Sequence, residues 1–269
     1  MTPVFSGESV RAMIVAAIGC SLIPLVFLGY YRAKTGVKLA SFFIGMGIYF
    51  VFSFFGGSIL NMLFLSILGL GHLLSDHPVY LSVYYALSAG LCGLLGSYFG
   101  LKYAMKNRPG KQNAFVFGLG AGGLECILYG GIVNITALVL ALFVNSFGLD
   151  GYLEKMQIAS EEMETQRQLI LDRATIPASS IYSDALLQFL SMCLQTALTI
   201  LIYQAITHKE DFKFFPIAIV LNVIGYIPVY LSQADVLTND TITIAIMTVY
   251  IFVILFFVYR FYHSERMAC

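Results

Sequence analysis

What this sequence has little of is charge. Only 11% of its 269 residues are Asp, Glu, Lys or Arg, whereas 59% are hydrophobic and the mean hydropathy is +0.83. Soluble domains carry about 25% charged residues, so the composition excludes a soluble globular protein and predicts a polytopic membrane protein. The 15 basic and 15 acidic residues cancel, which leaves no basic field for nucleic acid. We therefore expect membrane lipids as partners and no nucleic acid.

The sequence also lacks the residue patterns of a metal or redox centre. Its five cysteines include no CxxC pair, and four of them lie in apolar runs, where a thiol behaves as a small hydrophobic group. His72, His77, His208 and His263 all lie outside the apolar runs. His72 and His77 share a polar loop, but no third or fourth ligand stands at a fixed spacing from them. The sequence predicts no metal site and no cofactor, zinc included.

What the sequence does have is seven long apolar runs. They predict an all-α integral membrane protein, a bundle of seven transmembrane helices in one polytopic domain over residues 1–269. The second run is too long for one straight span, and Gly56 with Gly57 predicts a kink in it. The predicted helices cover residues 12–31, 39–70, 79–105, 114–147, 184–206, 214–233 and 241–259, with an acidic external loop at 148–180.

The distribution of basic residues predicts the orientation of these helices. Basic residues near the ends of spans stay in the cytoplasm, and acidic residues contribute little to this rule. With the N-terminus outside and the C-terminus in the cytoplasm, eleven of the fifteen Lys and Arg residues lie on the cytoplasmic side. Three of the other four lie in the long external loop, where charge bias has least effect.

The fourth apolar run contains a single carboxylate, Glu125. A charged group at bilayer depth costs at least about 2.5–3.5 kcal/mol, so such a residue is a functional hypothesis by default. Gly118, Gly122 and Gly130 lie at helical spacing around it, and small residues allow a neighbouring helix to pack closely. We expect Glu125 to face protein. The alternative is that it only staples helices through a hydrogen bond, which contributes about 0.6 kcal/mol on average.

Aromatic residues are concentrated in the second apolar run, over residues 42–55. We interpret this stripe as lipid-facing bulk with no binding role. Its members are Phe42, Phe43, Tyr49, Phe50, Phe52, Phe54 and Phe55.

The residues from Gly118 to Glu125 resemble a motif of the YhfC-type family of intramembrane proteases, relatives of the CAAX-processing and bacteriocin-processing membrane endopeptidases. In that family this helix reads glycine, any residue, glycine, histidine, glycine, glycine, any residue, glutamate. The histidine and glutamate are four apart, on one helix face. The resemblance extends to the layout of nearly the whole chain and implies a multi-pass protein of the bacterial cytoplasmic membrane.

This chain departs from the family pattern at most of the functional positions. Ala121 stands where the histidine would be, and only Glu125 is kept. The third helix of the family usually carries a glutamate pair followed three residues later by an arginine. The matching positions here are Gly93, Leu94 and Ser97.

The fifth and sixth helices depart in the same way. The glutamate, arginine and histidine of the family's fifth helix fall on Leu187, Gln188 and Gln195. The histidine and aspartate of its sixth helix fall on Asn222 and Tyr226. Every imidazole and every carboxylate of the family pattern except Glu125 is therefore missing from these positions.

The resemblance implies chemistry that Glu125 alone cannot perform. Attack of water on a peptide bond needs a base, groups that hold the water or a metal, and an oxyanion donor. Glu125 with the amides of Gln195 and Asn222 makes a poor transition-metal site. A buried carboxylic acid can instead stay protonated and share hydrogen bonds with these amides.

We therefore interpret the chain as a catalytically degenerate member that binds a membrane peptide, a partner helix or a lipid in its bundle cavity. One alternative is an active, atypical peptidase in which Glu125 works with Gln195, Asn222 and Tyr226. Another is a small transporter subunit in which Glu125 is a proton-coupling carboxylate. Internal repeats would favour the transporter, and the glycine-rich helix occurs once.

Overall fold

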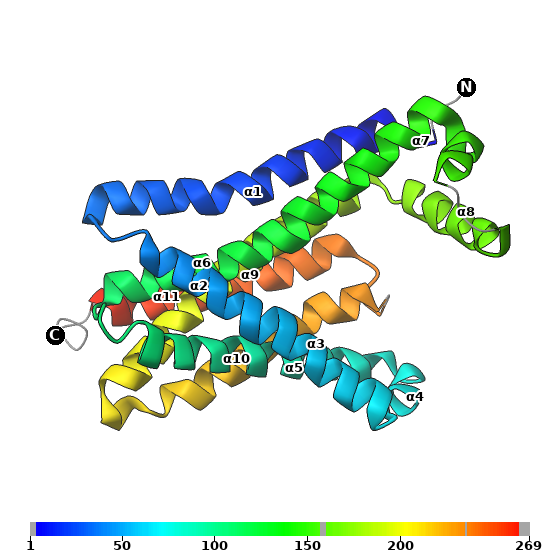
Figure 1. Cartoon of the computed structure of the whole chain (residues 1–269). Coiled ribbons are helices and arrows are strands. Elements are labelled where there is room, and N and C mark those ends of the chain that lie inside the picture. The colour runs from blue at the N-terminus through cyan, green and yellow to red at the C-terminus, as the bar shows by residue number, and fades with distance from the viewer. Residues whose placement is uncertain (1–3, 157–159, 235, 264–269) are drawn as a thin grey trace.

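The computed structural model describes residues 4–156, 160–234 and 236–263 (Figure 1). In this part of the chain, seven helical stretches are long and apolar enough to cross a membrane. This finding confirms the predicted all-α class with seven membrane-spanning helices. The stretches are Gly7–Thr35, Ala40–Ile67, Pro78–Ala104, Lys111–Lys155, Ala178–Thr207, Phe214–Gln233 and Asp240–Arg260.

Several of these stretches contain π-helical segments between α-helices. The helices along the chain are α1 (Gly7–Thr35), α2 (Ala40–Tyr49), α3 (Gly57–Asn61), α4 (Leu70–Ser75), α5 (Pro78–Phe99), α6 (Lys111–Glu125), α7 (Val133–Lys155), α8 (Ser160–Ala174), α9 (Ala178–Thr207), α10 (Phe214–Gln233) and α11 (Asp240–His263). The π-helical segments are η1 (Phe50–Gly56), η2 (Met62–Ile67), η3 (Gly100–Ala104) and η4 (Cys126–Ile132), and η5 (Lys209–Asp211) is a 3₁₀ turn. Gly56, where the sequence predicts a kink, ends η1.

Local sequence signals set the ends of the first helix. The Ser6 side chain accepts a hydrogen bond from the Ser9 backbone amide at 3.0 Å and so caps the N-terminus of α1. At the other end Gly36 adopts a φ of 69°, and its amide donates to the Arg32 carbonyl. This left-handed conformation favours glycine, because it has no Cβ. Ser6 and Gly36 therefore determine where the first membrane helix begins and ends.

The segment predicted as an external loop is largely helical in the structure. α7 continues to Lys155 with a non-helical residue, Gly148, at φ 74° and ψ 162°. α8 follows, and Ile170 on it is buried in a cluster with residues of α1 and α7. Arg167 of α8 forms an ion pair with Asp150. The buried face of α8 therefore packs against the ends of two membrane helices.

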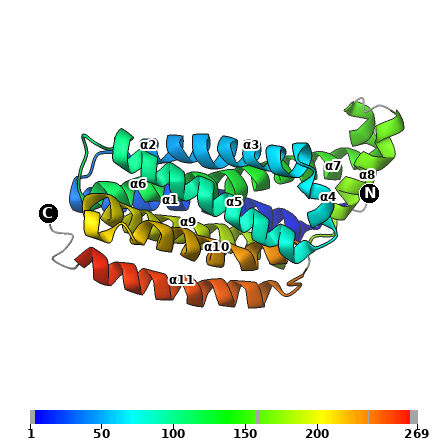
Figure 2. The same ribbon diagram turned by 90° about the horizontal axis from the view of Figure 1, so that it is seen from below.

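α9 lies at the centre of the bundle, and 16 of its 30 residues are buried. It packs against α1, α6, α10 and α11, while α2 covers α6 and α5 covers α10. Figure 2 shows the long helices side by side, with α4 and α8 at one end and the C-terminal end of α11 at the other. A residue on the inner face of α6 therefore lies among helices from both halves of the chain.

Candidate functional site

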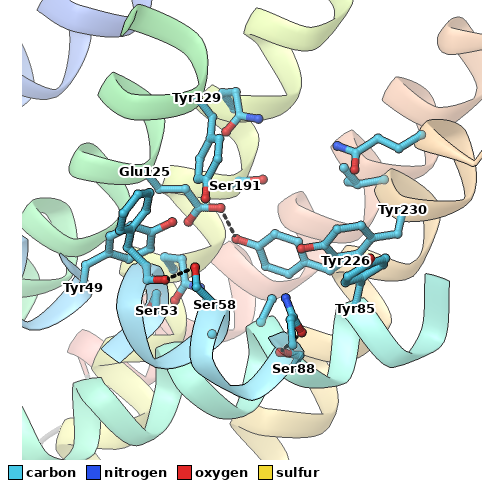
Figure 3. A pocket seen from close by; sticks show the side chains of 18 residues that line it. Tyr49, Ser53, Ser58, Tyr85, Ser88, Glu125, Tyr129, Ser191, Tyr226 and Tyr230 are labelled. Carbon is cyan, nitrogen blue, oxygen red and sulfur yellow. Dashed lines mark hydrogen bonds between the residues drawn. The ribbon is translucent and has the colours of Figure 1, made fainter. Parts of the chain in front are cut away.

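Glu125 is buried at the junction of α6 and η4, with 8% of its surface exposed. The Tyr226 hydroxyl on α10 donates a hydrogen bond to its Oε1 atom at 2.7 Å (Figure 3). Its Oε2 atom is buried and has no hydrogen-bond partner among the described residues. Because a buried polar atom without a partner is costly, Oε2 marks this position as one that water or a ligand would complete.

The glycines around Glu125 lie at close helix contacts. A Cβ atom on Gly118 would lie 2.9 Å from the Cβ of Thr199, and one on Gly122 would lie 2.9 Å from the Cα of Met192. Both neighbours belong to α9. A Cβ on Gly130 would overlap the side chain of Cys20 on α1. The glycines thus hold the helix that carries Glu125 against the centre of the bundle.

Glu125 borders a cavity of about 290 Å³. The cavity wall is rich in hydroxyl and amide groups, and it comes from α2, η1, α3, α5, α6, η4, α9 and α10. Its residues are Tyr49, Ser53, Phe54, Gly57, Ser58, Asn61, Tyr85, Ser88, Ala89, Glu125, Tyr129, Gln188, Ser191, Gln195, Tyr226, Val229, Tyr230 and Gln233. A polar hollow inside an apolar bundle is the default candidate for a binding site.

Two π-helical segments form facing parts of this wall. η1 follows Tyr49 and contains Ser53, and η4 follows Glu125 and contains Tyr129. π-helical turns are rare and occur often at functional sites. Tyr49 and Ser53, like Glu125 and Tyr129, are four residues apart, a spacing that places side chains on one helix face. All four line the cavity.

The structure pairs Glu125 with a tyrosine and not with both predicted amides. Gln195 lines the cavity, is 4% exposed, and approaches the Tyr226 hydroxyl. Asn222 is fully buried one turn from Tyr226, and neither of its amide atoms has a hydrogen-bond partner among the described residues. The expected cluster of one carboxyl group and two amides is therefore a cluster of Glu125, Tyr226 and Gln195, and Asn222 lies outside the cavity wall.

Of the remaining positions matched to the family pattern, Gln188 lines the cavity with Glu125, and the others do not. A Cβ atom on Gly93 would lie 3.4 Å from the amide nitrogen of Gln195, so this glycine faces the site. Leu94 is buried in the main apolar cluster. The Ser97 hydroxyl donates to the Gly93 carbonyl of its own helix at 3.0 Å. Ala121 is buried where the backbones of α6 and α2 meet.

The interpretation of the aromatic stripe as lipid-facing bulk is wrong for several of its members. Phe42 is fully buried, and Tyr49 is 8% exposed and lines the cavity together with Phe54. Phe43 is 61% exposed, as expected for a residue that faces lipid. A signal for the difference was present in the sequence, because Tyr49 begins a series of small or polar residues at four-residue spacing: Tyr49, Ser53, Gly57 and Asn61.

A family model described as YhfC intramembrane metalloprotease matches residues 19–248. The chain belongs to the YhfC family. It is 24% identical to the uncharacterized membrane protein YhfC of Bacillus subtilis (strain 168) over 234 residues. This aligned region covers 87% of this chain and 89% of that protein. No solved structure gives a significant match. The predicted resemblance is therefore confirmed, and the protein is a multi-pass protein of a bacterial membrane.

The family description includes a metal, but the residues of this site do not fit one. Within the described residues, no group of three or more His, Cys, Asp or Glu side chains lies close enough together to hold a metal ion. The neighbouring groups that could bind a metal are the Tyr226 phenol, which is bonded to Glu125, and the Gln195 amide, which approaches that phenol. Transition metals prefer imidazole, thiolate and carboxylate ligands, and a catalytic zinc needs three protein ligands. A single carboxyl group does not meet that requirement.

Proposed function

We propose that this chain is a catalytically degenerate member of the YhfC family that binds a membrane peptide, a partner's transmembrane helix or a lipid in its bundle cavity. The observation that carries the proposal is the pairing of Glu125 with Tyr226 beside a polar cavity. Among the described residues, Glu125 is the only Asp, Glu, Lys, Arg or His in the cavity wall.

Hydrolysis of a peptide bond would require more functional groups than the site around Glu125 provides. A base must take a proton from water, and a separate donor must stabilise the oxyanion about 3 Å from the reacting atom. The Tyr226 hydroxyl is the nearest donor, and it already donates to Glu125. The same contact occupies Oε1 of the one candidate base. Catalysis would need the Tyr226 hydroxyl free to donate to an oxyanion, whereas binding does not.

The first experiment tests for residual proteolysis. A strain that lacks the gene is complemented with the wild-type protein or with Glu125→Gln, and new N-termini in the membrane fraction are compared by mass spectrometry. We expect the two strains to give the same set of N-termini. A set of cleaved membrane peptides present with the wild type and absent with Glu125→Gln would establish the alternative, an active and atypical peptidase that uses Glu125.

The second experiment identifies what the cavity holds. A photo-crosslinking amino acid is placed at Ser58, which lines the cavity, or at Val249 of α11, which is 66% exposed. We expect Ser58 to yield one discrete crosslinked peptide, helix or lipid species, and Val249 to yield only bulk lipid. Identical products at the two positions would contradict binding in the cavity.

We also propose that the N-terminus lies outside, so that the cavity opens to the external side. The support is the clustering of basic residues at one end of the bundle. The lining residues Asn61 and Gln233 end α3 and α10, and those ends face α4, away from the basic turn between α5 and α6. A reporter fused after Lys155 should be active only if it functions outside the cell.

A further inference from the structure

We infer that the cavity beside Glu125 recognises an organic ammonium group, on a small amine or on a phospholipid head group. This inference rests on the proposed binding function and adds the chemical class of the ligand. Three features carry it: an unpartnered carboxyl oxygen, a wall of tyrosines, and the lack of any cationic side chain in that wall.

The carboxyl group supplies the charge, because a cation beside it favours its ionised form over its protonated form. Glu125 Oε2 is buried without a hydrogen-bond partner among the described residues, although Oε1 is bonded to Tyr226. No Lys, Arg or His occurs among the 18 residues of the wall. A buried carboxylate needs a cation or donors to offset its lost hydration. Since the protein provides one donor and no cation at this position, a positively charged ligand complements the site.

Tyrosines supply the surface around the charge. Five of the lining residues are tyrosines: Tyr49, Tyr85, Tyr129, Tyr226 and Tyr230. In Figure 3 the rings of Tyr49, Tyr129 and Tyr226 approach Glu125 from three different sides. The Tyr226 and Tyr230 rings lie 6.1 Å apart between centroids. Aromatic rings attract cations through their quadrupole, and aromatic cages are a recurrent means of binding quaternary ammonium groups.

The volume of the cavity and its polar groups favour an organic ammonium ligand over a metal cation or an uncharged ligand. A volume of about 290 Å³ lies just below the range of about 300–1,000 Å³ for drug-sized ligands, so it suits a small group. Hard metal cations require several carboxylate or carbonyl ligands, and this wall has one carboxyl group. An uncharged polyol would fit the hydroxyl and amide groups but would leave the charge of an ionised Glu125 uncompensated. An uncharged ligand, represented by a neutral isostere, is therefore the competing outcome of the test.

The test compares two probes of nearly the same shape. Radiolabelled choline is bound to the full-length protein in phosphatidylglycerol nanodiscs, and its neutral isostere 3,3-dimethylbutan-1-ol is the competitor. We expect choline to bind at least tenfold more tightly than the isostere. Glu125→Gln should weaken choline binding tenfold or more and leave the isostere unchanged. Tyr129→Leu should weaken choline binding severalfold, whereas Tyr30→Leu, at a residue of α1 that is 67% exposed, should not.

A second arm distinguishes the source of the ammonium group. If phosphatidylethanolamine in the nanodisc competes with choline, the ligand is a lipid head group, and if it does not, the ligand is a free amine. Equal affinity for choline and the isostere would overturn the ammonium inference while cavity binding stands. Binding of neither probe would also overturn it, and the crosslinked product at Ser58 would then decide the proposed function by itself.

Discussion

Two hollows of this bundle differ in how their polar atoms are satisfied. The polar cavity contains buried atoms without partners among the described residues, on Ser53, Glu125 and Gln188. A second hollow of about 440 Å³ is an apolar groove between α1, α6, α9 and α11. It is lined by Tyr31, Phe115, Thr196, Ala197, Ile200, Phe252, Leu255, Phe256, Val258, Tyr259 and Tyr262.

The hydroxyl groups of Tyr31, Tyr262 and Thr196 in this groove are hydrogen-bonded within the protein. The hydroxyls of Tyr31 and Tyr262 lie 2.7 Å apart and hydrogen-bond to each other, and Thr196 donates to its own helix. A lipid chain can therefore fill the groove without any loss of hydrogen bonding. The polar cavity differs, because an apolar occupant would leave its carboxyl and amide atoms unpaired. The apolar groove therefore needs no specific ligand. The polar cavity needs either water or a ligand that bonds to its unpaired polar atoms.

Of the substitutions that affect the two hollows differently, Gly45→Ala in α2 is expected to have the largest effect on stability and on ligand binding. A Cβ atom there would overlap the Phe117 carbonyl oxygen on α6. Because the clash involves backbone, α2 must move, and we expect a loss of about 3 kcal/mol in the free energy of unfolding. α2 ends at Tyr49 in the wall of the polar cavity and contributes no residue to the groove. Ligand binding in the cavity should therefore fall more than lipid binding in the groove.

Gly47→Ala is the matched control for this substitution. It lies on the same helix, and a Cβ atom there would meet nothing within 4 Å. Alanine also favours a helix over glycine by up to about 1 kcal/mol. Thermal unfolding in detergent should therefore show Gly47→Ala as stable as the wild type or slightly more stable. Equal losses for the two variants would mean that α2 and α6 do not pack as closely as the structure places them.

A smaller effect is expected from removing one tyrosine hydroxyl in each hollow. Tyr226→Phe removes the hydrogen bond to Oε1 of buried Glu125 and so leaves both carboxyl oxygens without a partner among the described residues. We expect a loss of about 2 kcal/mol in the free energy of unfolding. Tyr31→Phe removes a neutral hydroxyl pair in the groove and should cost no more than about 1 kcal/mol. Denaturant titration of both variants measures the difference. If Tyr31→Phe is the more damaging, the two hollows do not differ in polar satisfaction.

Tryptophan reporters can show directly what fills each hollow, because the chain has no tryptophan of its own. Tyr85→Trp reports on the polar cavity and Phe256→Trp on the groove. Brominated lipid chains should quench Phe256→Trp about twofold or more and Tyr85→Trp less. Acrylamide, which enters from water, should show the reverse order. Equal quenching of the two by brominated lipid would contradict a hydrated polar cavity.

The sequence predicts the membrane bundle well because long apolar runs are a strong, local signal. It also singles out Glu125, since one carboxyl group in an apolar run stands out by itself. It does not predict the cavity wall. Tyrosines and serines are common in membrane helices, and the four-residue spacing of Tyr49, Ser53, Gly57 and Asn61 indicates a shared helix face but not which helices that face meets.

The partner of Glu125 illustrates the same limit. Gln195, Asn222 and Tyr226 all lie on helices that pack near α6, and the sequence predicts the two amides as its partners. The structure joins Glu125 to the tyrosine, whose longer side chain reaches it from α10. Asn222 is one turn away on the same helix and makes no such contact. The length of each side chain and the rotation of its helix about the helix axis decide which residue hydrogen-bonds to Glu125. Residue spacing alone predicts neither.

The smallest effect is expected at Ser97, a position that the sequence resemblance predicts to correspond to an arginine of the family pattern. Its hydroxyl donates to the Gly93 carbonyl of its own helix, a bond that Ser and Thr commonly make in membrane helices. Ser97→Ala should therefore lower the free energy of unfolding by about 0.5 kcal/mol, the lower end of what one hydrogen bond contributes, and choline binding should stay unchanged. A large loss of binding would mean that Ser97 acts on the cavity through Gly93, which faces Gln195. Ser97 would then belong to the binding site although it does not line the cavity.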